Sequence, residues 1–244
     1  MHRILTDTIT LLEDAPNLSE QARRHLKVVR LKEGERVELF DGKGRWRVFA
    51  LRRGALESSG EICEAARPPK SALVLFACVT KGSRWDWTIE KATELGVTRI
   101  VPVISDRTIV RIAPAERESK RARWMRVAED AARQSDAKWL PEVAAPVDFA
   151  EAVSMAAQHD CYVGALATPR PKDALSALEA GRGERAARPL AVFVGPEGDF
   201  TPEELAALLA VATPVSFGAT VLRAETAAIY GVGVLKAWRD SHEV

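Results

Sequence analysis

The sequence is poor in the residues that build disulfide frameworks and metal sites. Its 244 residues include only three cysteines and four histidines, which are Cys63, Cys78, Cys161, His2, His25, His159 and His242. Cysteines that are few, odd in number and widely spaced support neither a disulfide framework nor a zinc site. The histidines are equally scattered. We therefore expect no metal.

Long apolar runs are also lacking. No stretch approaches the ~20 apolar residues that a helix needs to cross a bilayer. The opening segment, MHRILTDTIT, has no apolar core of the kind that a signal peptide carries. These absences predict a cytoplasmic protein without a membrane segment. A chain of 244 residues is long enough for one large domain or two modest ones.

The net charge of +1 conceals an uneven distribution. Residues 1–140 hold 27 Lys and Arg against 20 Asp and Glu, a surplus of +7. Residues 141–244 hold 8 against 14, a deficit of −6. A basic first part indicates contact with a polyanion such as RNA. A solvated surface without any partner is the alternative.

The first part of the chain has the pattern of a β-rich domain. Residues 37–40 and 45–49 alternate in polarity and are joined by DGKG, a strong hairpin signal. Residues 19–29 precede them with a helical pattern. Consecutive prolines in Arg67-Pro68-Pro69-Lys70 stop both helix and strand, so this segment is the expected linker. We therefore expect one domain over residues 1–68 and a second over 72–244.

The second domain shows the alternation of an α/β fold. A strand over residues 72–79, a helix over 85–95 and a strand over 98–104 form a βαβ unit, which implies a parallel sheet. A basic amphipathic helix is expected over residues 117–135. A further strand is expected over 160–167, and a short helix with a loop over 171–188.

The last quarter of the chain contains two glycine loops, each following a strand. The strand at residues 190–194 runs into Gly195, and the strand at 214–217 runs into Gly218. Between them, TPEE has the residues of a helix start, with Thr201 as N-cap and Glu204 closing a capping box. A closing helix is expected over residues 222–238. Such loops meet at the carboxyl edge of an α/β sheet, where ligands bind, although ordinary strand–helix turns would show the same spacing.

The residues of these loops resemble a known family signature. GPEGDF followed by FGATVLRAETA is similar to the paired C-terminal motif of the SPOUT RNA methyltransferases, and most of all to the RsmE family, which methylates N3 of a uridine in 16S ribosomal RNA. That family's pair has the form GPEGGF and LGxRILRxETA. Here Asp199 replaces the second glycine, Phe217 the leucine, and Thr220-Val221 the usual Arg-Ile. HLKVVRLKEGERVELFDGKG and RWMRVAEDAARQS extend the resemblance over nearly the whole chain.

The resemblance implies an architecture, a cofactor and partners. It implies a PUA-like β-barrel that binds RNA over residues 1–68 and an α/β methyltransferase domain with a trefoil knot over 72–244. S-adenosylmethionine would be the cofactor, and 16S ribosomal RNA or the small ribosomal subunit the substrate. It also implies a homodimer formed through the C-terminal domain. Ala224, Ala227, Ala228 and Gly231 would permit the close approach of a partner helix, or of a neighbour within the same chain.

The resemblance also implies site residues, position by position. Arg223 would stabilise negative charge on the uracil oxygens, since guanidinium is a fixed cation with several donors. Glu197 would bind the cofactor, help to remove the N3 proton, or fix its own loop. The cofactor would lie against Leu166, Gly195, Glu197, Gly198, Ser216, Gly218, Val221 and Leu222. RNA would be contacted by Arg3, His25, Arg30, Lys32, Arg45 and Lys81.

Two other functional classes share features of this sequence. A non-catalytic RNA-binding or ribosome-assembly protein would carry the same basic first domain. A Rossmann-type dinucleotide enzyme would have G-x-G-x-x-G after the first strand of the larger domain, and that motif is absent there. The exact uridine, the general base and the basic residues that contact RNA are not defined by the sequence.

Overall fold

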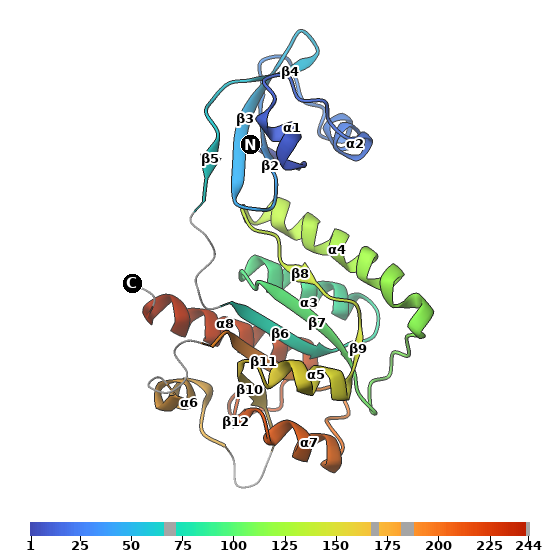
Figure 1. Cartoon of the computed structure of the whole chain (residues 1–244), viewed down its shortest axis with the longest axis vertical. Coiled ribbons are helices and arrows are strands. Elements are labelled where there is room, and N and C mark those ends of the chain that lie inside the picture. The colour runs from blue at the N-terminus through green and yellow to red at the C-terminus, as the bar shows by residue number, and fades with distance from the viewer. Residues whose placement is uncertain (66–71, 167–170, 182–187, 243–244) are drawn as a thin grey trace. The chain divides into compact units, whose positions relative to one another are not determined.

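The computed structural model describes residues 1–65, 72–166, 171–181 and 188–242 (Figure 1). Its first unit comprises Met1–Arg67 and Glu129–Leu140, and its second unit comprises Pro68–Ala128 and Pro141–Val244. The division falls beside the expected proline linker, whose residues 67–70 lie outside the described ranges. Residues 129–140 join the first unit, although the sequence pattern had placed them in the second domain.

The first unit is built on a mixed sheet. Its strands follow the order β1 (His2–Leu5), β2 (Arg36–Phe40), β3 (Arg45–Arg52) and β4 (Ala55–Ser58), and β5 (Cys63–Glu64) also pairs with β3. β1 and β2 are parallel, whereas β2 and β3 form the predicted antiparallel hairpin, which is confirmed. Helices α1 (Thr8–Leu12) and α2 (Glu20–Val29) contribute Leu11 and Ala22 to the core that the sheet builds with Ile4, Val37 and Phe49.

The hairpin turn explains why residues 129–140 belong to the first unit. Gly42 and Gly44 both have positive φ, 67° and 92°. A Cβ atom at Gly42 would lie 2.3 Å from Leu140, and one at Gly44 would lie 2.4 Å from Trp139. The turn therefore needs glycine for its backbone conformation and for the close approach of the distant segment.

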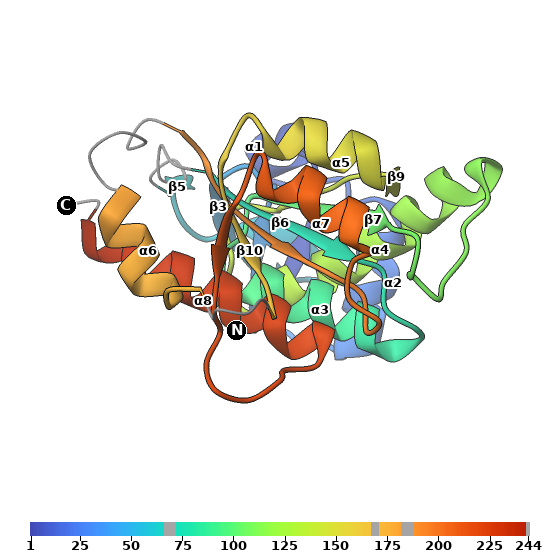
Figure 2. The same ribbon diagram turned by 90° about the horizontal axis from the view of Figure 1, so that it is seen from below.

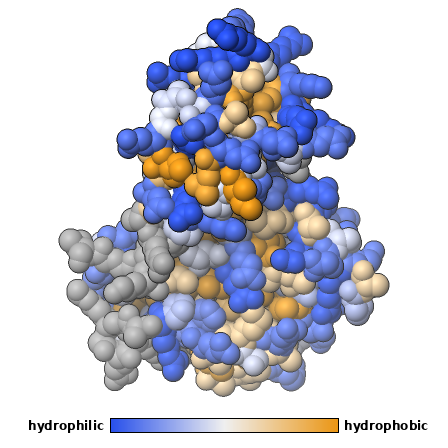
Figure 3. Space-filling model, turned by 45° about the horizontal axis from the view of Figure 1, so that its top comes forward, coloured by the Kyte–Doolittle hydropathy of each residue, from blue (hydrophilic) through white to orange (hydrophobic). Residues whose placement is uncertain are grey.

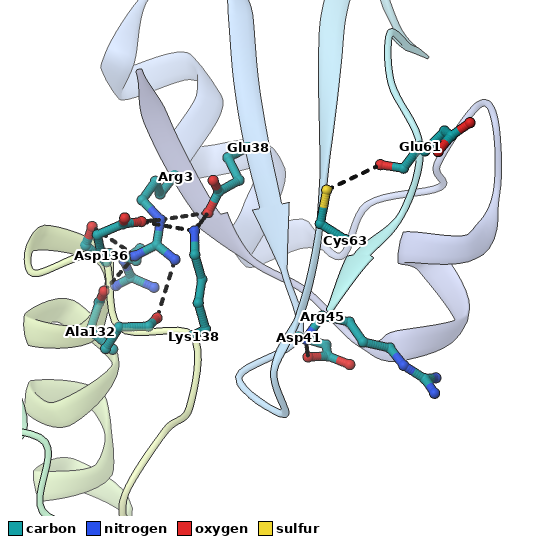
Figure 4. A network of polar contacts seen from close by, with 11 residues as sticks. Arg3, Glu38, Asp41, Arg45, Glu61, Cys63, Ala132, Asp136 and Lys138 are labelled. Carbon is teal, nitrogen blue, oxygen red and sulfur yellow. Dashed lines mark hydrogen bonds and ion pairs between the residues drawn. The ribbon is translucent and has the colours of Figure 1, made fainter. Parts of the chain in front are cut away.

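A buried ion cluster ties the same segment to β1 and β2 (Figure 4). Arg3 Nε lies 2.7 Å from Glu38 Oε1, and Arg3 Nη1 donates to the carbonyl of Ala132 at 2.7 Å. Lys138 Nζ contacts the same Glu38 oxygen at 2.7 Å, and Asp136 pairs with both cations. The Arg3 side chain is only 8% exposed, and its charge is balanced by carboxylates of the first unit.

The described residues of the second unit form a seven-stranded sheet in which the paired strands are parallel. This arrangement confirms the predicted α/β class. β12 (Thr213–Val215) is at one edge and is followed by β10 (Asp160–Gly164), β11 (Leu190–Val194), β6 (Leu73–Cys78) and β7 (Arg99–Ile104). The short strands β8 (Glu142–Val143) and β9 (Val147–Asp148) both pair with β7.

Helices cover both faces of this sheet (Figure 2). One face carries α3 (Ser83–Glu94), α6 (Ala174–Gly181), α8 (Ala224–His242) and the first part of α4 (Arg117–Gln134), which follows the short helix η1 (Pro114–Glu116). The other carries α5 (Phe149–Ala156) and α7 (Pro202–Leu209). α5 was not predicted. The predicted strand over 160–167 ends at Gly164, and residues 167–170 and 182–187 lie outside the described ranges.

The strands of the second unit are apolar on both sides because both sides are covered. In β6, Leu73, Leu75 and Ala77 enter one core, and Val74, Phe76 and Cys78 enter the other. Hydrophilic side chains are spread over the face drawn in Figure 3, with hydrophobic ones in smaller groups between them. No helix of the described ranges is long and apolar enough to span a bilayer.

Candidate active site

A pocket of about 740 Å³ opens at the carboxyl edge of the second unit's sheet. Its walls are the segments that follow three neighbouring strands, β10, β11 and β12, together with the start of α8. The lining residues are Gly164, Ala165, Leu166, Val194, Gly195, Pro196, Glu197, Asp199, Ser216, Phe217, Gly218, Ala219, Thr220, Val221, Leu222, Arg223, Ala224 and Ala227. This is the edge at which α/β sheets bind ligands.

Glycine is required where these segments approach one another. A Cβ atom at Gly164 would lie 2.4 Å from the ring of Phe217, and one at Gly195 would lie 3.0 Å from Phe200. Gly218 has a φ of 118°, in the region that other residues avoid. The two glycine loops of the sequence therefore do converge on one pocket.

Most residues that the sequence singled out for this site line the pocket. Gly198 does not: its carbonyl accepts a hydrogen bond from Arg107 Nη1 at 2.9 Å. The sequence interpretation omitted pocket residues that flank the motif positions, which are Gly164, Ala165, Val194, Pro196, Asp199, Phe217, Ala219, Thr220, Ala224 and Ala227. Asp199 stands where the resembling family has glycine, and its own φ is positive, 59°. Asp tolerates this conformation better than most residues.

Two arginines hold the loop after β11. Arg84, in the first turn of α3, places Nη2 3.2 Å from Glu197 Oε1. Arg107 Nη1 donates to the carbonyls of Gly198 and Phe200 at 2.9 and 3.2 Å. Neither arginine was identified from the sequence, because nothing local links either one to the loop. Glu197 therefore faces the pocket as one half of an ion pair.

The helix that follows this loop begins as predicted. Thr201 Oγ1 accepts a hydrogen bond from Glu204 N at 3.1 Å, and Glu204 Oε2 accepts one from Thr201 N at 3.1 Å. This reciprocal pair is a capping box and confirms the predicted start. Glu204 Oε1 also accepts from the backbone N of Asp106 at 2.9 Å, which ties the loop to the segment after β7.

Arg223 is the cation in the pocket wall. It is exposed, and its carbonyl accepts from Ala227 N at 2.8 Å at the start of α8. No carboxylate of the described ranges is seen to pair with it. Its guanidinium is therefore available to a ligand in the pocket.

The second unit offers no activated thiol. Burial raises the pKa of Cys78 to about 12, and its hydrogen bonds with Ser105 and Thr108 lower the pKa only in part. Burial likewise raises the pKa of Cys161. Both thiols are thus protonated at neutral pH and unreactive. Within the described ranges, no group of three His, Cys, Asp or Glu side chains is placed to hold a metal ion.

The residues expected to contact RNA differ in availability. Arg30, Lys32 and Lys81 are exposed, and Arg45 is part-exposed and pairs with Glu64 at 2.6 Å. Arg3 is buried in the ion cluster of Figure 4, so its expected place at an RNA surface does not fit its position.

His25 is half-buried, and its pKa is lowered. Burial is the main cause, with the nearby charges of Arg133 and His2 adding to it. Because the shift is downward from an ordinary value near 6.5, the ring is neutral at pH 7. At neutral pH the His25 side chain therefore contributes no positive charge to RNA binding.

Comparison with known proteins shows which family has this fold and pocket. A family model described as the RNA methyltransferase domain matches residues 67–236, and one described as the RNA methyltransferase PUA domain matches residues 18–53. Ribosomal RNA small subunit methyltransferase E from Synechocystis is 31% identical, with 98% of this chain and 78% of that protein aligned. The protein of the same name from Mycobacterium bovis is 32% identical, with 85% and 80% aligned.

Solved structures agree with this result. A methyltransferase E from Neisseria gonorrhoeae bound to S-adenosyl methionine has a TM-score of 0.82 and 26% identity over 97% of both chains. A structure from Legionella pneumophila, in complex with the same cofactor, has a TM-score of 0.82 and 28% identity over 97% of both chains. The chain belongs to the RNA methyltransferase family whose curated members are named ribosomal RNA small subunit methyltransferase E.

The glycine at position 164 is predicted to be necessary for the pocket. In Gly164→Ala the new methyl group meets Phe217, and we expect overpacking to destabilise the protein by about 1–3 kcal/mol. Gly233→Ala is the matched control: Gly233 lies within α8 with open space around its Cβ position. There, alanine should stabilise the helix by about 0.5–1 kcal/mol. Urea unfolding measures both changes, and similar shifts for the two variants would contradict the assigned role of Gly164.

Proposed function

We propose that this protein transfers a methyl group from S-adenosylmethionine to N3 of a uridine in 16S ribosomal RNA, free or within the small subunit, in the cytoplasm. The observation that carries this proposal is the single pocket where two glycine loops meet beside Arg223. Membership of the RNA methyltransferase family supports the reaction, and relatives solved with this cofactor support its identity.

The pocket fits the proposed cofactor in size and lining. Its volume of about 740 Å³ lies within the roughly 300–1,000 Å³ of small-molecule sites. Its walls consist of backbone, small side chains and a few apolar ones, which suits an adenine ring held by main-chain N–H and C=O groups. The residues that would hold the cofactor are Leu166, Gly195, Glu197, Ser216, Gly218, Val221 and Leu222. Gly198 would act indirectly, through the loop that its carbonyl helps to fix.

S-adenosylmethionine supplies a methyl group on a positively charged sulfur. The protein's main contribution would be alignment, since holding two reactants in line can supply most of the rate. N3 of uracil must lose its proton as it attacks. Arg223 would stabilise the negative charge that then develops on the uracil oxygens.

Glu197 has two candidate roles in this reaction. It would contact the cofactor or accept the N3 proton, and Arg84 would set the orientation of its carboxylate through their ion pair. Its charge is balanced by Arg84, so Arg223 keeps its own charge for the substrate.

The first unit would bind the RNA backbone. Arg30 and Lys32 are exposed there, Arg45 is part-exposed, and the exposed Lys81 of the second unit would add a further contact. Phosphate contacts of this kind give affinity and register without reading sequence. His25 would act as an uncharged contact at neutral pH, and Arg3 is left out of this set because it is buried.

The reaction is tested by the variant Arg223→Ala. Wild-type protein with S-adenosylmethionine and 16S ribosomal RNA should yield N3-methyluridine, detected by mass spectrometry of the nucleosides. The variant should lose at least about 100-fold in rate, the scale of losing a group that stabilises developing charge. Its unfolding midpoint and its calorimetric affinity for the cofactor should stay close to wild type.

Arg188→Ala, an exposed arginine outside the pocket, is the control and should turn over normally. Wild-type turnover by Arg223→Ala would remove Arg223 from the mechanism. Absence of any affinity for S-adenosylmethionine in the wild-type protein would instead favour a non-catalytic RNA-binding protein.

RNA binding is tested by the double variant Arg30→Ala/Lys32→Ala. Its affinity for ribosomal RNA should fall, and the slope of log K against log salt should become shallower by about 1.4–1.8, since each lost phosphate contact removes about 0.7–0.9. Lys236→Ala in α8 and His25→Ala should keep the wild-type slope at neutral pH. An unchanged slope in the double variant would assign RNA binding to other residues.

We also propose a homodimer formed through the C-terminal domain. Leu166, Val221 and Tyr230 of the second unit are exposed apolar side chains, and the first two lie at the pocket. Light scattering at micromolar concentration should give about twice the chain mass of 26.7 kDa. A monomeric mass would count against the dimer.

A further inference from the structure

Three buried polar atoms of the second unit surround one small cavity. Thr80 Oγ1, Trp85 Nε1 and Glu225 Oε2 each lack a hydrogen-bond partner among the described residues, and all three residues line this cavity. The residues are 3%, 2% and 8% exposed. Buried polar atoms without partners are rare and costly in native proteins. Three of them at one place indicate a functional arrangement.

The cavity lies against the candidate active site. Val194, Gly195 and Ala224 line both the cavity and the large pocket. Thr80 follows β6, Trp85 is in the first turn of α3, and Glu225 is in the first turn of α8. The three polar atoms therefore lie where these three segments meet, next to the large pocket.

The position of Glu225 bears directly on Arg223. Arg223 immediately precedes α8, and its carbonyl accepts a hydrogen bond from Ala227 N at 2.8 Å, so its backbone is joined to the first turn that carries Glu225. Glu225 is buried, and Arg223 is exposed and lines the pocket. Holding Glu225 in the cavity thus fixes the rotation of the first turn of α8, and with it the direction of Arg223.

The three groups are chemically complementary. The indole N–H of Trp85 can only donate, the carboxylate of Glu225 can only accept, and the hydroxyl of Thr80 can do both. The cavity is too small to hold a water molecule, so a direct hydrogen bond within the cluster is what would satisfy these groups. The same Trp85 ring also packs edge-on against Trp124, with centroids 5.5 Å apart, so its ring and its N–H have separate roles.

We propose that Thr80, Trp85 and Glu225 form a buried polar cluster that positions Arg223 for methyl transfer, with Glu225 as the positioning residue. This inference rests on the proposed function for its kinetic consequences. Its structural consequence is independent of that function: without Glu225, the first turn of α8 loses its anchor and Arg223 moves.

The kinetic test compares Glu225→Ala and Glu225→Gln with Glu203→Ala, which removes an exposed glutamate from the first turn of α7. Glu225→Ala should lower kcat by about 100-fold, the usual penalty of a small misplacement of a catalytic group. The KM for S-adenosylmethionine should change much less. Glu225→Gln retains an accepting oxygen and should recover most of kcat, and Glu203→Ala should match wild type. If Glu225→Ala does not fold, Thr80→Val removes a single polar group at nearly constant volume and should lower kcat in the same way.

A double-mutant cycle then separates positioning from general support. If Glu225 acts through Arg223, adding Glu225→Ala to Arg223→Ala should cost little further activity. Additive losses would overturn the proposal, as would wild-type kcat in all folded variants.

Crystal structures of the wild-type and Glu225→Ala proteins complete the test without relying on activity. An unmoved Arg223 in the variant would overturn the proposal. If the wild-type protein fails to methylate ribosomal RNA, the proposed function is wrong, and these structures still decide the role of the cluster.

Discussion

The site depends on one constraint, which is that β10, β11 and β12 are parallel neighbours that end together. Val163 pairs with Phe193 and Gly164 with Val215, so the residues that follow each strand emerge at the same level of the sheet. The chain must then turn three times within a small space. Glycine at positions 164, 195 and 218 makes this possible, because a side chain there would meet a ring or force an unfavourable φ. The pocket is the space that these turns enclose.

The first unit also uses glycine, in its case to allow a distant segment of the chain to pack closely. Its hairpin turn admits Trp139 and Leu140 through Gly42 and Gly44, and its charges are paired internally around Glu38. A buried carboxylate that meets two cations keeps each of them from being an unpaired buried charge. The basic surplus of the first part of the chain is consequently not all at the surface. Arg3 and Lys138 are used for folding, whereas Arg30 and Lys32 remain exposed.

Local patterns predicted much of this structure because the forces involved are local. The DGKG hairpin, the capping box at Thr201 and Glu204, and the β6–α3–β7 unit all depend on neighbours in sequence. Contacts between residues that are far apart in the sequence were not predicted. Nothing near Arg3 shows that Glu38 and Ala132 will surround it, nothing near Arg84 shows that it will meet Glu197, and nothing in the glycine loop shows that the Gly198 carbonyl turns towards Arg107.

The small residues of α8 show how packing and chemistry share one helix. The sequence left open whether they meet a partner helix or the same chain. Ala228 is buried against the sheet, and a Cβ atom at Gly231 would lie 2.8 Å from Val192 and 3.1 Å from Phe217. These two positions therefore bring α8 close enough to β11 to support Phe217, whose ring in turn occupies the space beside Gly164. Because Ala228 and Gly231 are already packed within the chain, a partner subunit would have to use the exposed side of α8, where Tyr230 lies.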